Sequence, residues 1–356
     1  MSGMWGNNIR VSIFGESHGN AIGINIDGLP SGFHIDMDKV MVEMARRAPG
    51  KSPLSTPRKE GDIPEILSGY FEGKTTGTPL CAIIRNSNTK SKDYSKLKDV
   101  MRPGHADYTG AMRYDGFNDY RGGGHFSGRI TAPLVFAGAI CKQILESKGI
   151  SIAAHVNSIG SIKDKSFLDV DINEELILSF KGKELPLINS ELEEAMRQEV
   201  MNARKDMDSI GGTIECVVLG IKPGIGNPFF DSVESTLAHL MFSVPAVKGI
   251  EFGKGFDISK MRGSEANDEY YLDGKTIKTK TNNNGGILGG ITNGMPIVFK
   301  VAIKPTASIF KEQSTVNIAT MEETKLSIEG RHDPCIVQRA LPVIEAVTAI
   351  GILELM

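Results

Sequence analysis

The segment from Arg102 to Thr131, RPGHADYTGAMRYDGFNDYRGGGHFSGRIT, concentrates side chains that bind anions and move protons. It contains four arginines, two histidines and seven glycines, three of which are consecutive. Arginine presents a fixed fork of donors that matches phosphate or carboxylate oxygens, and histidine titrates near neutral pH. Glycine lets backbone N–H groups approach a ligand closely because it has no Cβ. The segment has no helical or strand periodicity, so we predict a loop that holds an anion and moves a proton. A solvated loop with its charges in water is the alternative.

The composition makes this concentration of cations a local feature. The chain has 356 residues, enough for one large or two ordinary domains, and 40% of them are hydrophobic. A net charge of −3 argues against nucleic acid or a membrane surface as partners, because bulk basicity is absent. We expect no signal peptide, and the longest apolar-rich run is too short to cross a bilayer. The four cysteines are widely scattered without zinc spacing, which predicts reduced core thiols in a cytosolic protein and no metal.

Hydrophobic patterns predict the elements that would position the loop. We expect strands within 9–14, 21–32, 79–85, 211–221 and 297–303, and helices over 36–47, 132–149, 190–205, 231–242 and 335–356.

Three further segments carry candidate functional residues at the ends of these elements. Ser17 and His18 lie in GESHG, a glycine-bounded turn between two predicted strands. The pattern matches the nucleophile elbow of hydrolases, but that motif requires a helix after the serine. Arg47 ends the helix over 36–47, where the helix dipole favours cations. The sequence Lys304-Pro305-Thr306 follows a strand and could hold a phosphate.

The last candidate is Asp333 in RHDP, just before the C-terminal helix. Asp333 at the N-cap and Pro334 at the first helical position form a strong helix-start signal. Capping would explain Asp333 without any function, but it leaves the neighbouring Arg331 and His332 unexplained.

Taken together, these segments closely resemble the chorismate synthase family over nearly the whole chain. The resemblance depends on seven motifs in order: GESHG with DGLPSG, RRAPG, RPGHADYTGAMRY, DYRGGGHFSGR, NNGGILGGITNG, KPTASI and RHDPCIVQRALPVIEA. It implies a carbon–oxygen lyase that eliminates phosphate, in a 1,4-anti sense, from 5-enolpyruvylshikimate 3-phosphate to give chorismate. It also implies a requirement for reduced FMN, an α+β fold of the β-α-β sandwich type, a single domain over 1–356 and a cytoplasmic homotetramer.

The resemblance also implies roles for individual residues. His18 matches the proton donor to the leaving phosphate, with Ser17 beside it. His105 matches the histidine near flavin N1, and Asp333 matches the acid that works with flavin N5 to remove the ring proton. The implied substrate anchors are Arg47, Arg102, Arg129 and Arg331.

Flavin contacts are implied for eleven positions, and the chain departs from the family at some of them. The positions are His125, Phe126, Ser127, Ala246, Gly289, Lys304, Pro305, Thr306, Ala307, Ser308 and Arg331. The family more often has Arg-Ser-Ser-Ala-Arg-Glu where this chain has HFSGRI. His125 keeps a donor but Phe126 loses a hydroxyl, so these two contacts are in question. A further arginine common in the family is Pro53 here; either Arg58 replaces it or that contact is lost.

Two alternatives from other classes stay open. The same arginines could form a phosphate-binding module without catalysis, which would tolerate loss of His18 or Asp333. A serine hydrolase acting through Ser17 would react with a fluorophosphonate probe. Whether NADPH or an external flavin reductase supplies the electrons is not decided by the sequence.

Overall fold

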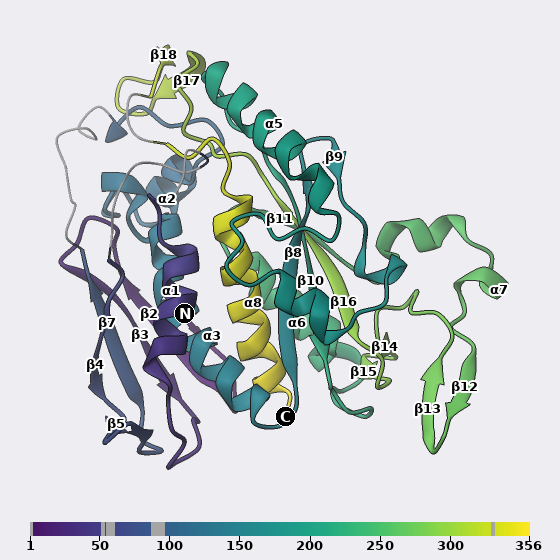
Figure 1. The fold of residues 1–356 in the computed structure, drawn as a ribbon. Helices are drawn as coiled ribbons and strands as arrows, with labels where there is room; N and C mark the ends of the chain where they lie inside the picture. The colour runs from purple at the N-terminus through teal and green to yellow at the C-terminus, as the bar shows by residue number, and fades with distance from the viewer. Residues whose placement is uncertain (1–2, 51–53, 55–60, 87–96, 329–331) are drawn as a thin grey trace.

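The structure, a computed structural model, describes residues 3–50, 54, 61–86, 97–328 and 332–356. Two five-stranded sheets lie on either side of a layer of long helices, with α1, α3 and α8 between them (Figure 1). Every strand pair in both sheets is antiparallel. The predicted α+β class is therefore confirmed.

The first sheet has the strand order β1-β2-β3-β7-β4. The strands are β1 (Met4–Trp5), β2 (Arg10–Gly15), β3 (Ala21–Asp27), β7 (Leu80–Arg85) and β4 (Pro64–Ser68). Side chains alternate between the two faces of a strand, and Ile22, Ile24 and Ile26 of β3 all enter the core. The turn between β2 and β3 carries Ser17 and His18, so this sheet fixes one edge of the candidate site.

The second sheet has the order β11-β16-β10-β8-β9 and is covered on both faces. Its strands are β11 (Val247–Phe252), β16 (Ile297–Ile303), β10 (Gly212–Leu219), β8 (Ser151–Ile159) and β9 (Ile162–Lys163). Ala154 of β8 joins the main core, which contains residues of both sheets, whereas Ala153 packs with Phe167 and Phe180 on the opposite face. This double coverage explains why most residues of β8, β10 and β16 are buried on both faces of the sheet.

The helical layer consists of α1 (Met37–Arg47), α3 (Thr131–Glu146) and α8 (Val337–Glu354). The predicted cap of α1 is confirmed, because the Asp36 side chain accepts hydrogen bonds from two backbone N–H groups of the first turn. A Cβ atom at Gly138 of α3 would lie 2.3 Å from the Cα atom of Ala346 of α8. The close crossing of α3 and α8 therefore requires glycine at this position.

The start of α8 differs from the prediction. The helix begins at Val337 after an N-cap at Ile336 that makes no side-chain capping bond. The Asp333 cap and the Pro334 first position are therefore wrong. The Asp333 carboxylate instead accepts a hydrogen bond from Nη1 of Arg339, so a tertiary ion pair takes the group that the local signal assigned to the helix end.

Shorter elements surround this frame. The helices are α2 (Asp107–Arg113), α4 (Glu174–Ser179), α5 (Glu193–Lys205), α6 (Val233–Ser243) and α7 (Gly263–Ala266). The hairpins are β5–β6 (Tyr70–Phe71, Lys74–Thr75), β12–β13 (Tyr270–Asp273, Thr276–Thr279), β14–β15 (Ile287–Leu288, Ile291–Thr292) and β17–β18 (Gln313–Asn317, Glu322–Leu326). The 3-10 turns include η2 (Arg121–Phe126) and η3 (Gly128–Ile130), which lead into α3. Within the described part of the chain, no helix has the length and apolar character needed to cross a membrane.

Candidate active site

The three consecutive glycines bring the two predicted histidines together. Gly122 and Gly123 have φ angles of 59° and 85°, in the left-handed region that glycine adopts readily. A Cβ atom on Gly122 would lie 2.1 Å from Cε1 of His18, and one on Gly123 would lie 3.0 Å from Cε1 of His105. The rings of His18 and His105 therefore lie against adjacent glycines, although the two residues are far apart in sequence.

The turn between β2 and β3 holds His18 in one orientation. Oγ of Ser17 lies 3.1 Å from Nδ1 of His18, and it is also 3.1–3.2 Å from the carbonyl oxygens of Arg121 and Gly122. The Ser17 hydroxyl can donate to these carbonyls while its oxygen accepts from Nδ1–H. Ser17 is 2% exposed and is followed by strand β3, not by a helix. The nucleophile elbow of a hydrolase is therefore absent from this turn.

His105 belongs to a cluster with Arg102 and Asp107. Arg102 binds Asp107 through Nε and Nη2, each 2.7 Å from a carboxylate oxygen, and Nδ1 of His105 lies 2.7 Å from the same carboxylate. Burial alone would raise the pKa of Asp107, but hydrogen bonds and charges from Arg102 and His105 hold it well below its usual range. Asp107 therefore stays ionised and fixes both the guanidinium and the imidazole.

Two other predicted anchors meet at one buried carboxylate, and we call Arg47, Asp62 and Arg129 the Asp62 cluster. Arg47 donates to one oxygen of Asp62 and Arg129 donates to the other. The Asp62 side chain is 0% exposed, and the two arginine side chains are 3% and 6% exposed. Burial would raise the pKa of Asp62, but the charges of the two arginines outweigh it and lower the pKa. Asp62 is therefore a buried anion between two cations.

Asn86 connects the Asp62 cluster to the turn that carries His18. Its side-chain oxygen accepts from Nε of Arg129 at 3.1 Å. Its side-chain nitrogen donates to the carbonyl oxygens of Glu16 and Gly19, at 3.0 and 2.9 Å. Because these two residues flank Ser17 and His18, the arginine and the histidine are held in one network.

Asp333 and His332 join the same region from the C-terminal side. Arg339, which binds Asp333, also donates from Nε to the carbonyl oxygen of Arg47 at 3.1 Å. Burial lowers the pKa of His332, and the nearby positive charge of Arg102 acts in the same direction. Nε2 of His332 is buried and has no hydrogen-bond partner among the described residues. A contact path thus runs from Asp333 through Arg339 to the Asp62 cluster, and His332 is close enough to feel the charges of Arg102 and Asp333.

Several of the predicted flavin contacts gather beside His105. The ammonium group of Lys304 donates to the carbonyl oxygen of Gly104, and a Cβ on Gly104 would lie 3.6 Å from Cβ of Ala307. The backbone N–H of Lys304 donates to the carbonyl oxygen of Ala246 at 2.9 Å. Oγ1 of Thr306 is buried without a hydrogen-bond partner in the described part of the chain. Pro305 and Ser308 belong to the same segment, exposed and buried respectively.

The other predicted flavin contacts are placed differently. Nδ1 of His125 is 2.8 Å from the carbonyl oxygen of Gly15, so His125 braces the turn before Ser17. Phe126 packs against α2, where a Cβ on Gly110 would lie 2.7 Å from its ring. Ser127 caps η3 through its side chain. Gly289 lies in the turn of the β14–β15 hairpin, before β16, whereas Lys304 follows the last residue of β16. Within one chain the structure therefore does not bring Gly289 to Lys304. Arg331, Pro53 and Arg58 lie outside the described residues.

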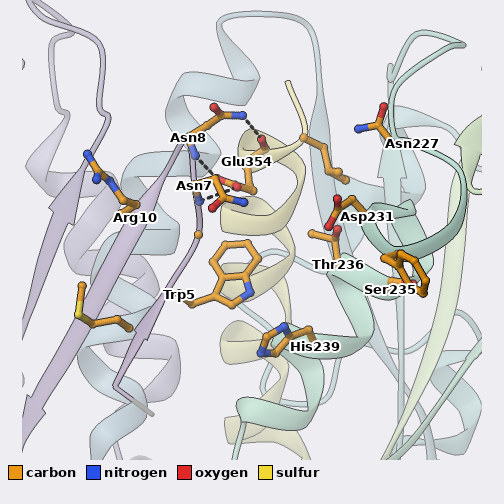
Figure 2. Close-up of a pocket in the computed structure, with 14 residues that line it drawn as sticks. Trp5, Asn7, Asn8, Arg10, Asn227, Asp231, Ser235, Thr236, His239 and Glu354 are labelled. Carbon is orange, nitrogen blue, oxygen red and sulfur yellow. Dashed lines mark hydrogen bonds between the residues drawn. The ribbon is translucent and has the colours of Figure 1, made fainter. Parts of the chain in front are cut away.

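A separate cavity of about 540 Å³ lies at the opposite end of α8 from this cluster (Figure 2). Its lining includes Trp5, Asp231, His239 and Glu354, and none of the predicted site residues. The Glu354 carboxylate is fully engaged, because three consecutive backbone N–H groups from Asn7 onward donate to it at 2.6–2.9 Å. This carboxylate anchors the N-terminal segment and is not a free acid or base.

Sequence reasoning missed five polar residues of the site: Asp62, Asn86, Asp107, His332 and Arg339. Asp107 stands inside RPGHAD and Arg339 inside the otherwise apolar C-terminal helix, so both were visible as polar residues in unusual places. Asp62 and Asn86 occur in polar loops and carry no local signal. The described residues include no group of three or more acidic, histidine or cysteine side chains placed to hold a metal ion.

The site brings together arginine, histidine and aspartate side chains, the groups that bind anions and transfer protons in enzymes. The family model for chorismate synthase matches residues 9–356. The chain is 44% identical over 355 residues to a chorismate synthase of Dehalococcoides mccartyi, covering 100% of this chain and 96% of the relative. It is 47% identical over 364 residues to the enzyme of Methanocaldococcus jannaschii, covering 99% and 95%. A solved structure described as a crystal structure of chorismate synthase covers 99% of this chain and 92% of its own, with a TM-score of 0.75 and 30% identity.

The chain therefore belongs to the chorismate synthase family. Its function is that of the family: elimination of phosphate from 5-enolpyruvylshikimate 3-phosphate to give chorismate, in the shikimate pathway. The family requires reduced flavin.

Proposed function

We propose that His18, His105 and Asp333 are the catalytic residues of this elimination, and that Arg47, Arg102 and Arg129 anchor the substrate. The observation that supports the proposal most strongly is the placement of His18 and His105 against adjacent glycines, next to Arg102. The substrate carries one phosphate and two carboxylates, and several convergent guanidinium groups match that charge. Arg331, which lies outside the described residues, is proposed as a further anchor.

His18 is proposed to protonate the departing phosphate oxygen. In the tautomer in which Nδ1–H donates to Oγ of Ser17, His18 carries the transferred proton at Nε2. A positioned general acid of this kind contributes about 10²–10⁴-fold to the rate. In that tautomer the Ser17 hydroxyl donates to a backbone carbonyl and not to His18, which argues against Ser17 as a nucleophile.

Asp333 is proposed to take part in removing the ring proton, and His105 to supply a hydrogen bond or proton at the cofactor. Arg339 keeps Asp333 in place, and Asp107 keeps His105 in place. The loop that carries His105 also contacts Lys304, so His105 lies beside the proposed cofactor region.

The residues beside His105 fit reduced FMN. Lys304 supplies an ammonium group, and Thr306 and His332 each hold a buried polar atom with no partner among the described residues. Such atoms are costly unless a ligand satisfies them. When bound, reduced flavin lends electron density that eases cleavage of the carbon–oxygen bond. Pro305, Ala307, Ser308 and Ala246 would shape the walls of this site, and Gly289 would reach it only from another chain.

Further features of the family are proposed for this chain as well. The layered sheets and helices are interpreted as the β-α-β sandwich, in a single domain over 1–356. We also propose a cytoplasmic location and a homotetrameric assembly. NADPH is the candidate electron donor, either directly or through an external flavin reductase.

The test is an anaerobic assay of phosphate release from the enolpyruvyl substrate, with dithionite-reduced FMN, with and without NADPH. His18→Ala is expected to lower turnover by about 10²–10⁴-fold. The matched control is His239→Ala, which removes an imidazole from the separate cavity of Figure 2 and should leave turnover unchanged. A phosphate-binding module without catalysis would release no phosphate in any of these samples, and full activity of His18→Ala would exclude its role as the acid.

A further inference from the structure

Asp62 occupies the position where an anion would be expected. Its two carboxylate oxygens each accept from a different arginine, one at the end of α1 and one in η3. A carboxylate of the substrate would present the same two oxygens to the same two guanidinium groups. Asp62 itself has a φ angle of 46°, in the left-handed region that non-glycine residues seldom adopt. The chain thus places its own carboxylate between two of the proposed substrate anchors.

Asp62 is not the only charge that acts on Arg47. Burial lowers the pKa of Arg47, and the positive charges of Arg339 and Arg129 act in the same direction against the effect of Asp62. Nε of Arg47 is buried and has no partner among the described residues. Arg47 therefore has a buried donor that its contact with Asp62 does not use, as a site for an added anion would.

The burial of Arg47 and Asp62 supports the same interpretation. Arg47 is 3% exposed and Asp62 is 0% exposed, so no anion from solvent can reach both arginines while Asp62 stays between them. The pairing of Arg102 with Asp107 is different, because both carboxylate oxygens of Asp107 bind the same guanidinium, through Nε and Nη2. That bidentate pair leaves Nη1 of Arg102 for another partner. Asp107 therefore orients one arginine, whereas Asp62 bridges two.

We infer that Asp62 is an internal counter-anion that an anionic group of the substrate displaces from at least one of the two arginines. The inference rests on the proposed function for the identity of the anchors. Displacement makes binding selective, because a small anion must compete with a carboxylate that is already in place. A ligand that carries several anionic groups gains contacts elsewhere, such as at Arg102, and can replace Asp62.

The first test is titration calorimetry of inorganic phosphate with wild type and Asp62→Asn. Asparagine has the shape of aspartate but no charge, so phosphate should bind the variant roughly tenfold more tightly or better, the value of one charge-assisted hydrogen bond. The control is Asp27→Asn, which removes the carboxylate of an exposed pair with Arg10 and should leave phosphate affinity unchanged. A merely structural role for Asp62 predicts weaker phosphate binding in Asp62→Asn, and equal or weaker binding overturns the inference.

If Asp62→Asn does not fold, a second measurement on the wild-type chain tests the inference. In a crystal structure of the wild-type chain with phosphate, the anion should contact Arg47 or Arg129, and Asp62 should have released that arginine. Phosphate bound elsewhere, with Asp62 still bridging both arginines at saturation, would refute the displacement. The outcome is separable from the proposed function: tighter phosphate binding by Asp62→Asn together with full turnover of His18→Ala would sustain the inference and defeat the proposed catalytic role of His18.

Discussion

Arg46 and Arg47 are neighbours at the end of α1, yet they enter two different charged clusters. Arg46 binds Glu345 of α8 at 2.6 and 3.0 Å, and Lys142 of α3 binds the same carboxylate at 2.8 Å. Glu43 completes this group, which we call the Glu345 cluster, by accepting from both cations. Arg47 instead enters the Asp62 cluster. In each cluster one buried carboxylate serves two cations.

The difference between the two clusters lies in whether their donors are satisfied. The Glu345 cluster has two acids and two bases, and the backbone N–H of Ala154 in β8 donates to Glu345 at 3.1 Å. It thereby joins α1, α3 and α8 to the second sheet. In the Asp62 cluster, Nε of Arg47 is buried without a partner among the described residues. We interpret the satisfied network as structural and the network with an unused donor as part of the proposed binding site.

The largest expected effect is on stability, from Glu345→Gln. The substitution removes the buried charge of Glu345 and leaves Arg46 and Lys142 with Glu43 as their remaining anion; breaking a buried pair costs about 3–5 kcal/mol. Urea denaturation should show that loss in the free energy of unfolding, while turnover per folded molecule stays near that of the wild type. The control Glu146→Gln removes an exposed partner of Lys39 and should alter unfolding little. A large loss of turnover in folded Glu345→Gln would erase the distinction between the two clusters.

The pH dependence of the same comparison follows from the pKa of Glu345. Burial alone would raise that pKa, but Arg46 and Lys142 lower it to about 2. A depressed folded-state pKa means that the stabilisation is present above the unfolded value of about 4.3 and is lost as pH falls through the folded value. The unfolding free energies of wild type and Glu345→Gln should therefore differ most near neutral pH and converge as the pH falls from about 4.3 toward 2.

The next largest effect is a loss of turnover in Asp333→Asn, a substitution in the candidate active site and not in the Glu345 cluster. Asparagine still accepts a hydrogen bond from Arg339, but it cannot take up a proton. Turnover should fall by about 10²–10⁴-fold, and the helical circular dichroism should not change because Asp333 does not cap α8. The control is Asp36→Asn, which alters a carboxylate that does cap a helix; asparagine caps as well as aspartate, so activity should persist. Full activity of Asp333→Asn would remove Asp333 from the chemistry.

Local sequence signals predicted those parts of the fold and site that depend on local physics. The helix over 36–47 with its Asp36 cap formed as expected, and so did the strands on either side of GESHG. The glycine-rich segment after Tyr120 adopts the left-handed backbone that only glycine takes without strain. Its position against both histidines follows from that freedom.

The remaining features depend on contacts between residues distant in sequence, which periodicity does not record. Asp62 meets Arg129, 67 positions away, and no pattern in the polar loop around Asp62 predicts this pair. The signal at Asp333 and Pro334 was strong but wrong, because Arg339 competes for the carboxylate and the helix starts later. Gly289 matches the family motif, but strand β16 lies between Gly289 and Lys304 within one chain. The motif alone does not reveal this separation. The seven extended residues of β16 alone span roughly 20 Å.

The smallest of these effects tests the contact that joins the two histidines, through Gly122→Ala. A methyl group there would lie 2.1 Å from Cε1 of His18 and 2.9 Å from Oγ of Ser17, so the imidazole must move. Misplacement of a catalytic group by about 1 Å costs on the order of a hundredfold in rate, which is the expected loss of turnover. The control Gly128→Ala adds a methyl group with no neighbour within 4 Å and without a positive φ, and it should leave turnover unchanged. Because the Glu345 cluster lies in the helical layer, its pH-dependent contribution to stability should be the same in Gly122→Ala as in the wild type. If Gly122→Ala instead matched Gly128→Ala in turnover, the close packing of His18 on the triple glycine would not matter for catalysis.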